Sequence, residues 1–300
     1  MKRLVVSIFI VMTVLPALAQ NDPQFSLYEF NRLLFNPAAT AQSEYVDIHL
    51  LAREQWAGFE QAPSTQSLSI SNYFSKWRTG AALTVINDKL GAENMQNIKA
   101  KYAYHAWLGE ENYISFGLGA GVMMRSFSSD GLILDEAGDP NRMEGDYKET
   151  KLDFDFGMEL HLKRFFIGGA VNHMTQSYND YDIMRVPRHY YGYAGYTFNP
   201  ANAFTLTPSF SMSKIDNINI YEASLMTNYA GKVWAGIGYR IEESFLLSTK
   251  VSISQHLHVA YSYDMAAGDL QNYRNGSHEI MLHVRIAKPQ KEYKSPRFFD

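Results

Sequence analysis

The sequence predicts an all-β protein: a transmembrane antiparallel β-barrel of about 14 strands with both termini periplasmic. Three observations predict this fold. The chain begins with an export signal, and no later stretch is apolar for long enough to form a spanning helix. Many segments alternate apolar and polar residues, and the connections between them tend to be long and short in turn. Because only helices and closed barrels cross a membrane, an exported chain with these features is expected to be a barrel.

The first 19 residues read as a signal peptide. Lys2 and Arg3 precede an apolar run at 4–15, and Ala17 and Ala19 occupy the small-residue positions of a signal peptidase site. A retained membrane anchor is less favoured, because the apolar run falls short of the ~20 residues that a spanning helix needs. We expect cleavage near Ala19, followed by a periplasmic N-terminal segment at 20–44, the barrel at 45–287 and a periplasmic C-terminal tail at 288–300.

The composition narrows the class of protein. The chain has no cysteine, which excludes a cysteine-linked lipid anchor, a disulfide and a thiolate metal site. Loss of Lys2 and Arg3 reduces the 27 basic residues to 25 against 31 acidic ones, and this acidic balance argues against nucleic acid as a partner. The 20 Tyr, 18 Phe and 4 Trp suit the aromatic girdles of a barrel, although a secreted all-β adhesin could share that bias.

The segment 151–162, KLDFDFGMELHL, shows the alternation most clearly. Leu152, Phe154 and Phe156 fall on one face, whereas Asp153 and Asp155 fall on the other. In a soluble sandwich the apolar face would cover a core, and in an outer-membrane barrel it would face lipid around a polar lumen. Strands are expected at 46–52, 64–74, 79–87, 97–108, 113–124, 151–162, 165–172, 189–198, 204–213, 218–229, 233–240, 245–254, 257–263 and 277–286.

The lengths of the connections favour the barrel over the sandwich. Counted from the first strand, the odd connections are mostly long, whereas the even ones are short, such as GEE and GK. The long connections are expected at 53–63, 88–96, 125–150, 173–188 and 264–276. Two further odd connections, at 214–217 and 241–244, are short exceptions. Turns at one rim and loops at the other are typical of outer-membrane barrels, with the turns in the periplasm.

The polar face of the strands then lines the lumen with charges of both signs. The expected lumen-lining residues are Lys99, Lys101, Asp153, Asp155, Glu159, His161, Lys250 and Arg285. Because a buried charge needs a partner or water, a hydrogen-bonded and partly filled interior is favoured, with a selective pore as the alternative. In 113–124, alternating glycines are expected to leave room for bulky neighbours or a bend in the wall.

Four stretches resemble the PorP/SprF family of outer-membrane proteins, found with the type IX secretion system of Bacteroidota. They are DPQFSLYEFNRLLFNPAATA, REQWAGFEQAPSTQSLSIS, YSYDMAAGDLQNYRNGSHEIMLH and SPRFF, which together bracket nearly the whole mature chain. The second stretch departs from the family pattern, since Glu60-Gln61 stands where a glycine is expected and Ser64-Thr65 replaces two threonines. The departure affects a loop and leaves the resemblance intact.

The resemblance implies an outer-membrane barrel that serves type IX secretion or gliding. Family members are associated with export, surface attachment or retention of large cargo proteins bearing the type B C-terminal sorting domain, and some link to periplasmic ring or peptidoglycan-binding components. No catalytic residues come with the family. We therefore expect a protein that binds such a cargo or ring component and sits in outer-membrane lipid, with a porin-like diffusion channel as the alternative.

Two stretches are the candidates for partner binding. The loop REQWAGFEQAP offers Arg53, Gln55, Trp56, Phe59 and Pro63, and exposed aromatics with an arginine are the usual anchors of interfaces. The alternative places Trp56 in the outer aromatic girdle and pairs Arg53 with lipid or a neighbouring loop.

At the other end of the chain, Phe298 and Phe299 are expected either to dock a periplasmic partner or to fold back on the turns.

Catalysis and metal binding are not expected. Ser277 and His278 alternate across a strand and cannot form a nucleophile and base pair, so a hydrolase would need a triad from separate strands, using His161 or His278. The acidic residues between Asp135 and Glu149 match no calcium loop and read as a solvated loop. His256 and His258 share one strand face, which is only a weak metal hint. We expect no cofactor.

Overall fold

The computed structural model describes residues 22–41, 43, 45–59, 61–128, 146–175, 186–241, 243–267 and 276–287. The strands are β1 (Val46–Glu54), β2 (Ser64–Phe74), β3 (Thr79–Leu90), β4 (Glu93–Trp107), β5 (Asn112–Phe127), β6 (Tyr147–Leu162), β7 (Phe165–Asn172), β8 (His189–Tyr196), β9 (Phe198–Ala201), β10 (Phe204–Ile215), β11 (Ile218–Tyr229), β12 (Val233–Arg240), β13 (Ser244–Ser252), β14 (Leu257–Ala266) and β15 (Ser277–Ile286).

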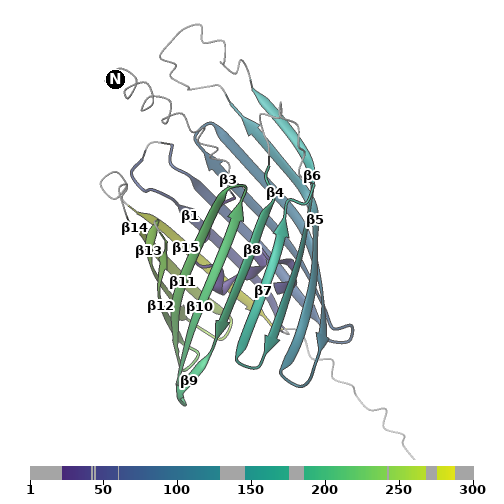
Figure 1. The fold of residues 1–300 in the computed structure, drawn as a ribbon, viewed down its shortest axis with the longest axis vertical. Helices are drawn as coiled ribbons and strands as arrows, with labels where there is room; N and C mark the ends of the chain where they lie inside the picture. The colour runs from purple at the N-terminus through teal and green to yellow at the C-terminus, as the bar shows by residue number, and fades with distance from the viewer. Residues whose placement is uncertain are drawn as a thin grey trace, which may run out of the picture.

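These strands form one closed antiparallel barrel (Figure 1). Neighbours along the chain pair with each other, β8 pairs with β10, and β1 pairs with β15 to close the wall. The short β9 pairs only with β10, so the barrel itself has 14 strands, as the sequence predicts. Among the described residues, no helix has the length and apolarity needed to cross a bilayer.

The strand bounds follow the alternating segments closely, with one clear difference. The expected loop at 88–96 is instead a tight turn at Gly91 and Ala92, since β3 runs to Leu90 and pairs there with Glu93 of β4. Gly91 has a φ of 57°, a left-handed conformation that a glycine adopts without steric cost. The largely polar stretches DKL and ENMQ therefore belong to a hairpin that continues the wall.

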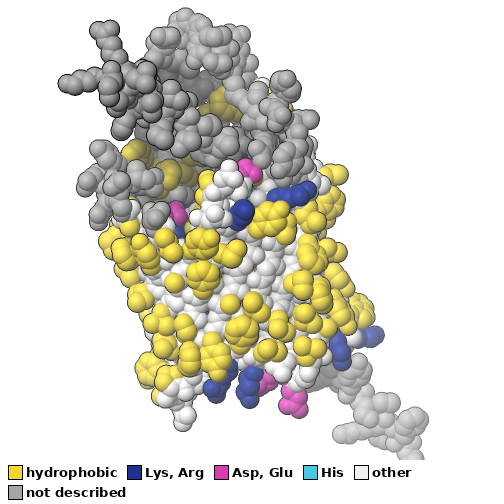
Figure 2. Space-filling view, viewed as in Figure 1, with side chains coloured by type: hydrophobic (Ala, Val, Ile, Leu, Met, Phe, Trp, Pro, Cys, Tyr) yellow, Lys and Arg dark blue, Asp and Glu magenta, His cyan; other side chains and the backbone are white. Residues whose placement is uncertain are grey.

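The wall is apolar outside and polar inside. Along β6, exposed Leu152 and Phe154 alternate with Asp153 and Asp155, which are at most 3% exposed. The space-filling view shows the outer side chains as a broad apolar band over the strands, with charged residues at its lower edge (Figure 2). This arrangement reverses that of a soluble sandwich and fits a barrel whose outer surface faces lipid.

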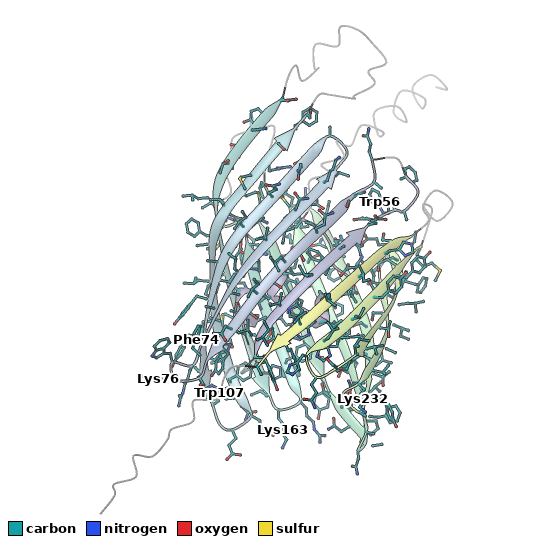
Figure 3. All side chains as sticks on the ribbon, turned by 180° about the vertical axis from the view of Figure 1, so that it is seen from behind. Trp56, Phe74, Lys76, Trp107, Lys163 and Lys232 are labelled. Carbon is teal, nitrogen blue, oxygen red and sulfur yellow. The ribbon has the colours of Figure 1, made fainter. Side chains whose placement is uncertain are left out.

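The two ends of the barrel differ. At the turn end, where β1 starts and β15 ends, the exposed Phe74 and Trp107 lie near Lys76, and Lys163 and Lys232 lie farther along the same rim (Figure 3). The opposite loop end carries the connections that follow β1, β5, β7 and β14. An even strand count brings Val46 and Ile286 together at the turn end. That the turn end faces the periplasm stays a prediction.

Residues 22–41, here called the plug, lie inside the barrel. The plug contains the 3-10 helices η1 (Tyr28–Phe30), η2 (Arg32–Leu34) and η3 (Pro37–Ala39). It runs from Asp22, beside His173 and His189 at the loop end, to Thr40, beside Gly80 near the turn end. The segment was expected on the periplasmic side with the other terminus, whereas its first described residue lies at the opposite end. Inward polar side chains can satisfy its irregular backbone, which explains this location.

Candidate functional site

Inward charges on β4 and β6 pair with one another and with the plug backbone. Lys99 Nζ on β4 lies 2.7 Å from Asp153 Oδ2 and 2.7 Å from Asp155 Oδ1 on β6. Lys101 Nζ donates to the carbonyl oxygens of Leu33 and Leu34 at 2.5 and 3.1 Å. The structure thus places these four expected lumen-lining residues together, where each charge has a partner.

A second charged cluster holds the first part of the plug. Arg53 Nη1 on β1 lies 3.0 Å from Glu279 Oε2 on β15, and Arg53 Nη2 lies 2.8 Å from Asp264 Oδ2 on β14. Glu279 also accepts hydrogen bonds from the backbone N–H groups of Ser26 and Leu27, at 2.9 and 3.0 Å. The three wall residues are therefore tied to the plug as well as to one another.

This cluster corrects the role expected for Arg53. Arg53 was a candidate for partner binding, but it is only 3% exposed and points into the lumen. The alternation of β1 explains this, since Asp47, His49 and Leu51 are buried on the same face.

The middle of the plug is anchored by Arg32 and Asn36. Arg32 Nε lies 3.3 Å from Glu159 Oε2, and its guanidinium stacks over Phe166 at 4.7 Å from the ring centroid. Tyr193 donates a hydrogen bond to the same Glu159 carboxylate and accepts one from Asn36 Nδ2 at 2.7 Å. Glu159, a further expected lumen-lining residue, thus connects β6 and β8 to the plug.

The last part of the plug packs directly on the backbone of the wall. A Cβ added at Gly117 on β5 would lie 2.2 Å from Ala38 N, and one added at Gly157 on β6 would lie 2.0 Å from Asn36 Oδ1. At Gly80 on β3, the added atom would lie 2.4 Å from the Thr40 carbonyl oxygen. The inward glycines therefore leave the space that η3 occupies.

Apolar contacts complete the fit between plug and wall. Leu27 and Leu34 cluster with Leu51, Ala260 and Met281 on the inner face. A pocket of about 100 Å³ remains beside the plug. Its lining is mixed, since Phe25 and Tyr28 of the plug share it with charged wall residues such as Lys99 and Arg240.

The remaining expected lumen residues are placed separately. His161 stacks on Tyr113 with ring centroids 5.1 Å apart, and Lys250 Nζ lies 4.3 Å from the ring centroid of Phe30 in the plug. Arg285 lies nearer the turn end, with its Nε 3.4 Å from Asp47 Oδ1.

The two histidines that gave a weak metal hint do not converge. His258 stacks on His283 with ring centroids 5.1 Å apart, whereas the exposed His256 lies by the Arg285 carbonyl oxygen. Phe298, Phe299 and most of the acidic loop between Asp135 and Glu149 lie outside the described residues.

The loop after β1 forms a surface at the loop end. Gln55 N donates to the Pro63 carbonyl oxygen at 2.9 Å, and Trp56 N donates to Ser277 Oγ at 3.2 Å. Phe59 is 53% exposed and lines a groove with Pro63. Figure 3 shows Trp56 at the end opposite to Trp107. Gln55, Trp56, Phe59 and Pro63 are here called the loop-end surface, which β15 supports from one side.

A cluster that sequence reasoning missed lies where the plug begins. Asp22 Oδ2 lies 2.8 Å from both His173 Nε2 and His189 Nδ1, at the loop ends of β7 and β8. These two histidines are 4% exposed or less. The only sequence signal was a histidine just after one strand and another at the start of the next.

His173 also joins this cluster to the charged residues of β6. Its Nδ1 lies 2.7 Å from Asp153 Oδ2, and its backbone N–H donates to Asp155 Oδ1 at 3.3 Å.

The comparison with protein families decides the class of this barrel. The family model described as "Type IX secretion system membrane protein PorP/SprF" matches residues 17–284. The chain belongs to this family. This match confirms the resemblance read from the four stretches. The PorP/SprF barrel is an outer-membrane component of type IX secretion, and its family is one of secretion components rather than catalysts. No curated protein matches the chain.

Two solved structures share the fold of this PorP/SprF protein. The Ralstonia pickettii toluene transporter TbuX matches with a TM-score of 0.51 and 9% identity, over 85% of this chain and 93% of that chain. The TodX deltaS2S3 mutant, described as a monoaromatic hydrocarbon channel, matches with a TM-score of 0.52 and 10% identity, over 84% of this chain and 92% of that chain. At such identities the likeness establishes the barrel fold alone.

Proposed function

We propose that this PorP/SprF barrel is a binding component of type IX secretion, which anchors or helps to export a large cargo protein at the cell surface. The cargo class is one with a type B C-terminal sorting domain, as the family implies. The observation that carries the proposal is the plug. A barrel whose lumen is occupied by its own chain acts through its rims more readily than through an open channel.

The contacts of the plug support this proposal. Three arginine and lysine side chains join the wall to the plug: Arg53 donates to Ser26 Oγ, Lys101 donates to the Leu33 carbonyl oxygen, and the partly buried Arg32 pairs with Glu159. Breaking a buried pair leaves an uncompensated charge, which costs about 3–5 kcal/mol, so thermal opening of the plug would be rare.

The loop-end surface supports a binding site at that rim. Phe59 and Trp56 offer aromatic side chains, the kind of residue that is enriched at interface centres. Trp56 has a φ of 55°, a conformation uncommon for a residue other than glycine, and its backbone is held to Ser277. A loop held in one conformation binds a partner with a smaller entropic cost than a freely moving loop.

The proposal is tested with a Trp56→Ala/Phe59→Ala double variant in the native host. We expect normal insertion of the barrel and a loss of surface cargo of about tenfold or more, since hot-spot residues contribute about 2 kcal/mol or more each. The matched control is Trp77→Ala, which removes a 63% exposed aromatic at the turn end. Normal surface cargo in the double variant would contradict the assignment of this surface.

Affinity purification with a C-terminal tag distinguishes the kinds of partner. A large exported protein in near-equal amount would support the cargo role. The other outcome is co-purification of periplasmic ring or peptidoglycan-binding components that the double variant retains and that changes at the turn end remove. That outcome would replace the cargo role with a link to the secretion machine. Purification of the barrel alone would favour the alternative, a porin-like diffusion channel.

A further inference from the structure

We propose that Asp22, His173 and His189 bind one divalent transition-metal ion, for which Zn²⁺ is the best fit, and that this ion fastens the start of the plug to β7 and β8. One oxygen or nitrogen atom from each residue lies within 4.8 Å of the others, so a single ion can reach all three. The proposal is independent of the cargo role.

The donor set matches zinc chemistry. Zn²⁺ takes imidazole nitrogens and carboxylate oxygens at about 2.0–2.2 Å, and three protein ligands plus water are a common arrangement. Calcium and magnesium prefer sets made of oxygen ligands alone, which this cluster does not offer. The pocket of about 100 Å³ is lined by Asp22 and His173, so there is space for a water ligand beside them.

The surroundings of His173 favour a metal ligand. Its Nδ1 lies 2.7 Å from Asp153 Oδ2, and that carboxylate is held in turn by Lys99 and Asn97. A carboxylate on Nδ1 orients the ring and leaves Nε2 to face Asp22, as in the carboxylate and histidine pairs around bound zinc. The rings of His173 and His189 stand at 86° to each other, and His173 Nε2 and His189 Nδ1 both lie 2.8 Å from Asp22 Oδ2.

The local charge also suits a cation. Asp22, Asp153 and Asp155 lie around this point, and the two ammonium groups of Lys99 and Lys101 offset two of the three carboxylates. Without a metal, His173 Nε2 and His189 Nδ1 both lie 2.8 Å from the same Asp22 oxygen. A divalent ion would bind all three ligands at once and release any proton held between them.

The test is zinc binding by the full-length protein in detergent, after removal of metal with a chelator. Zn²⁺ is titrated and the bound metal per chain is measured by mass spectrometry, with Co²⁺ as a spectroscopic probe. We expect one ion per chain in the wild type. We expect binding to be at least about tenfold weaker in Asp22→Asn and in His189→Ala, since each variant loses a direct ligand.

Two features keep the test decisive. Asp22→Asn changes the plug and leaves every wall strand intact, so its barrel is expected to fold, which heat-dependent gel mobility checks. The matched control is His256→Ala, an exposed histidine outside the cluster, which should bind zinc as the wild type does. The proposal is overturned if the wild type binds no zinc, or if the wild type and both cluster variants bind it equally. Asp22, His173 and His189 would then form only a hydrogen-bonded cluster of charged groups.

Discussion

The two ends of the plug are held by different means. Residues 22–27, at the loop end, are held by charge, through Asp22 with its histidines and through Arg53 and Glu279. Residues 36–40, nearer the turn end, are held by shape, because η3 lies against glycines of β3, β5 and β6. A charge-held contact is lost when one charge is removed, whereas a shape-held contact is lost when one atom is added. The loop-end part is therefore the part whose attachment to the wall depends on the charges of a few side chains.

The largest effect is expected from Arg53→Ala, which breaks the charge-held end. It leaves Glu279 buried without its arginine and Asp264 with only the more distant Arg240, at 3.7 Å, and we expect a loss of about 3–5 kcal/mol in the free energy of unfolding. Urea unfolding in detergent measures that loss, and trypsin cleavage after Arg32 reports release of the plug. The surface control Lys163→Ala, whose pair with Glu111 is exposed, should change stability by less than about 1 kcal/mol. Equal stability of the two variants would contradict the charge-held account.

A smaller effect is expected from Gly117→Ala, which tests the shape-held end. The added methyl group would overlap the backbone at Ala38, and overpacking costs about 1–3 kcal/mol. Faster trypsin cleavage after Arg32 than in the wild type would show that η3 no longer packs against β5. Gly238→Ala is the matched control, because its added atom would have no neighbour closer than 3.4 Å. If trypsin cleaves both glycine variants at the same rate, η3 does not pack against β5 in the membrane.

The smallest effect is expected from Asn36→Ala. Asn36 Oδ1 accepts a hydrogen bond from Ala38 N and caps η3, and its Nδ2 donates to Tyr193. Loss of such a cap costs about 1 kcal/mol, so the urea midpoint should fall slightly while the barrel stays closed. Asn36→Asp keeps the cap acceptor but places a second carboxylate near Glu159, and it should destabilise more than alanine does. The opposite order would show that repulsion between the new carboxylate and Glu159 carries little weight.

The strands of the wall could be predicted from the sequence because the alternation that defines a strand lies within a few consecutive residues. Alternation alone located β2, β7, β11, β12 and β15 at their observed bounds. The turn at Gly91 was missed because polar residues continue through a hairpin there, and polarity was taken as a sign of a loop. Arg53 was predictable in principle, since it shares a strand face with Asp47 and His49.

The plug and the zinc candidate could not be predicted in the same way. Residues 22–41 follow neither the helical nor the strand period, and their stability comes from wall residues more than 100 positions away, such as Glu159 and Glu279. Asp22, His173 and His189 come together only when the plug enters at the loop end. Such contacts depend on how a segment is threaded through the barrel, which no local pattern encodes.

Planar-bilayer conductance shows whether the N-terminal segment closes the barrel. The wild type should show no steady large open state, whereas Arg53→Ala should show openings as the plug loosens. A steady large conductance in the wild type, unchanged in Arg53→Ala, would contradict the account and identify the protein as a porin-like channel.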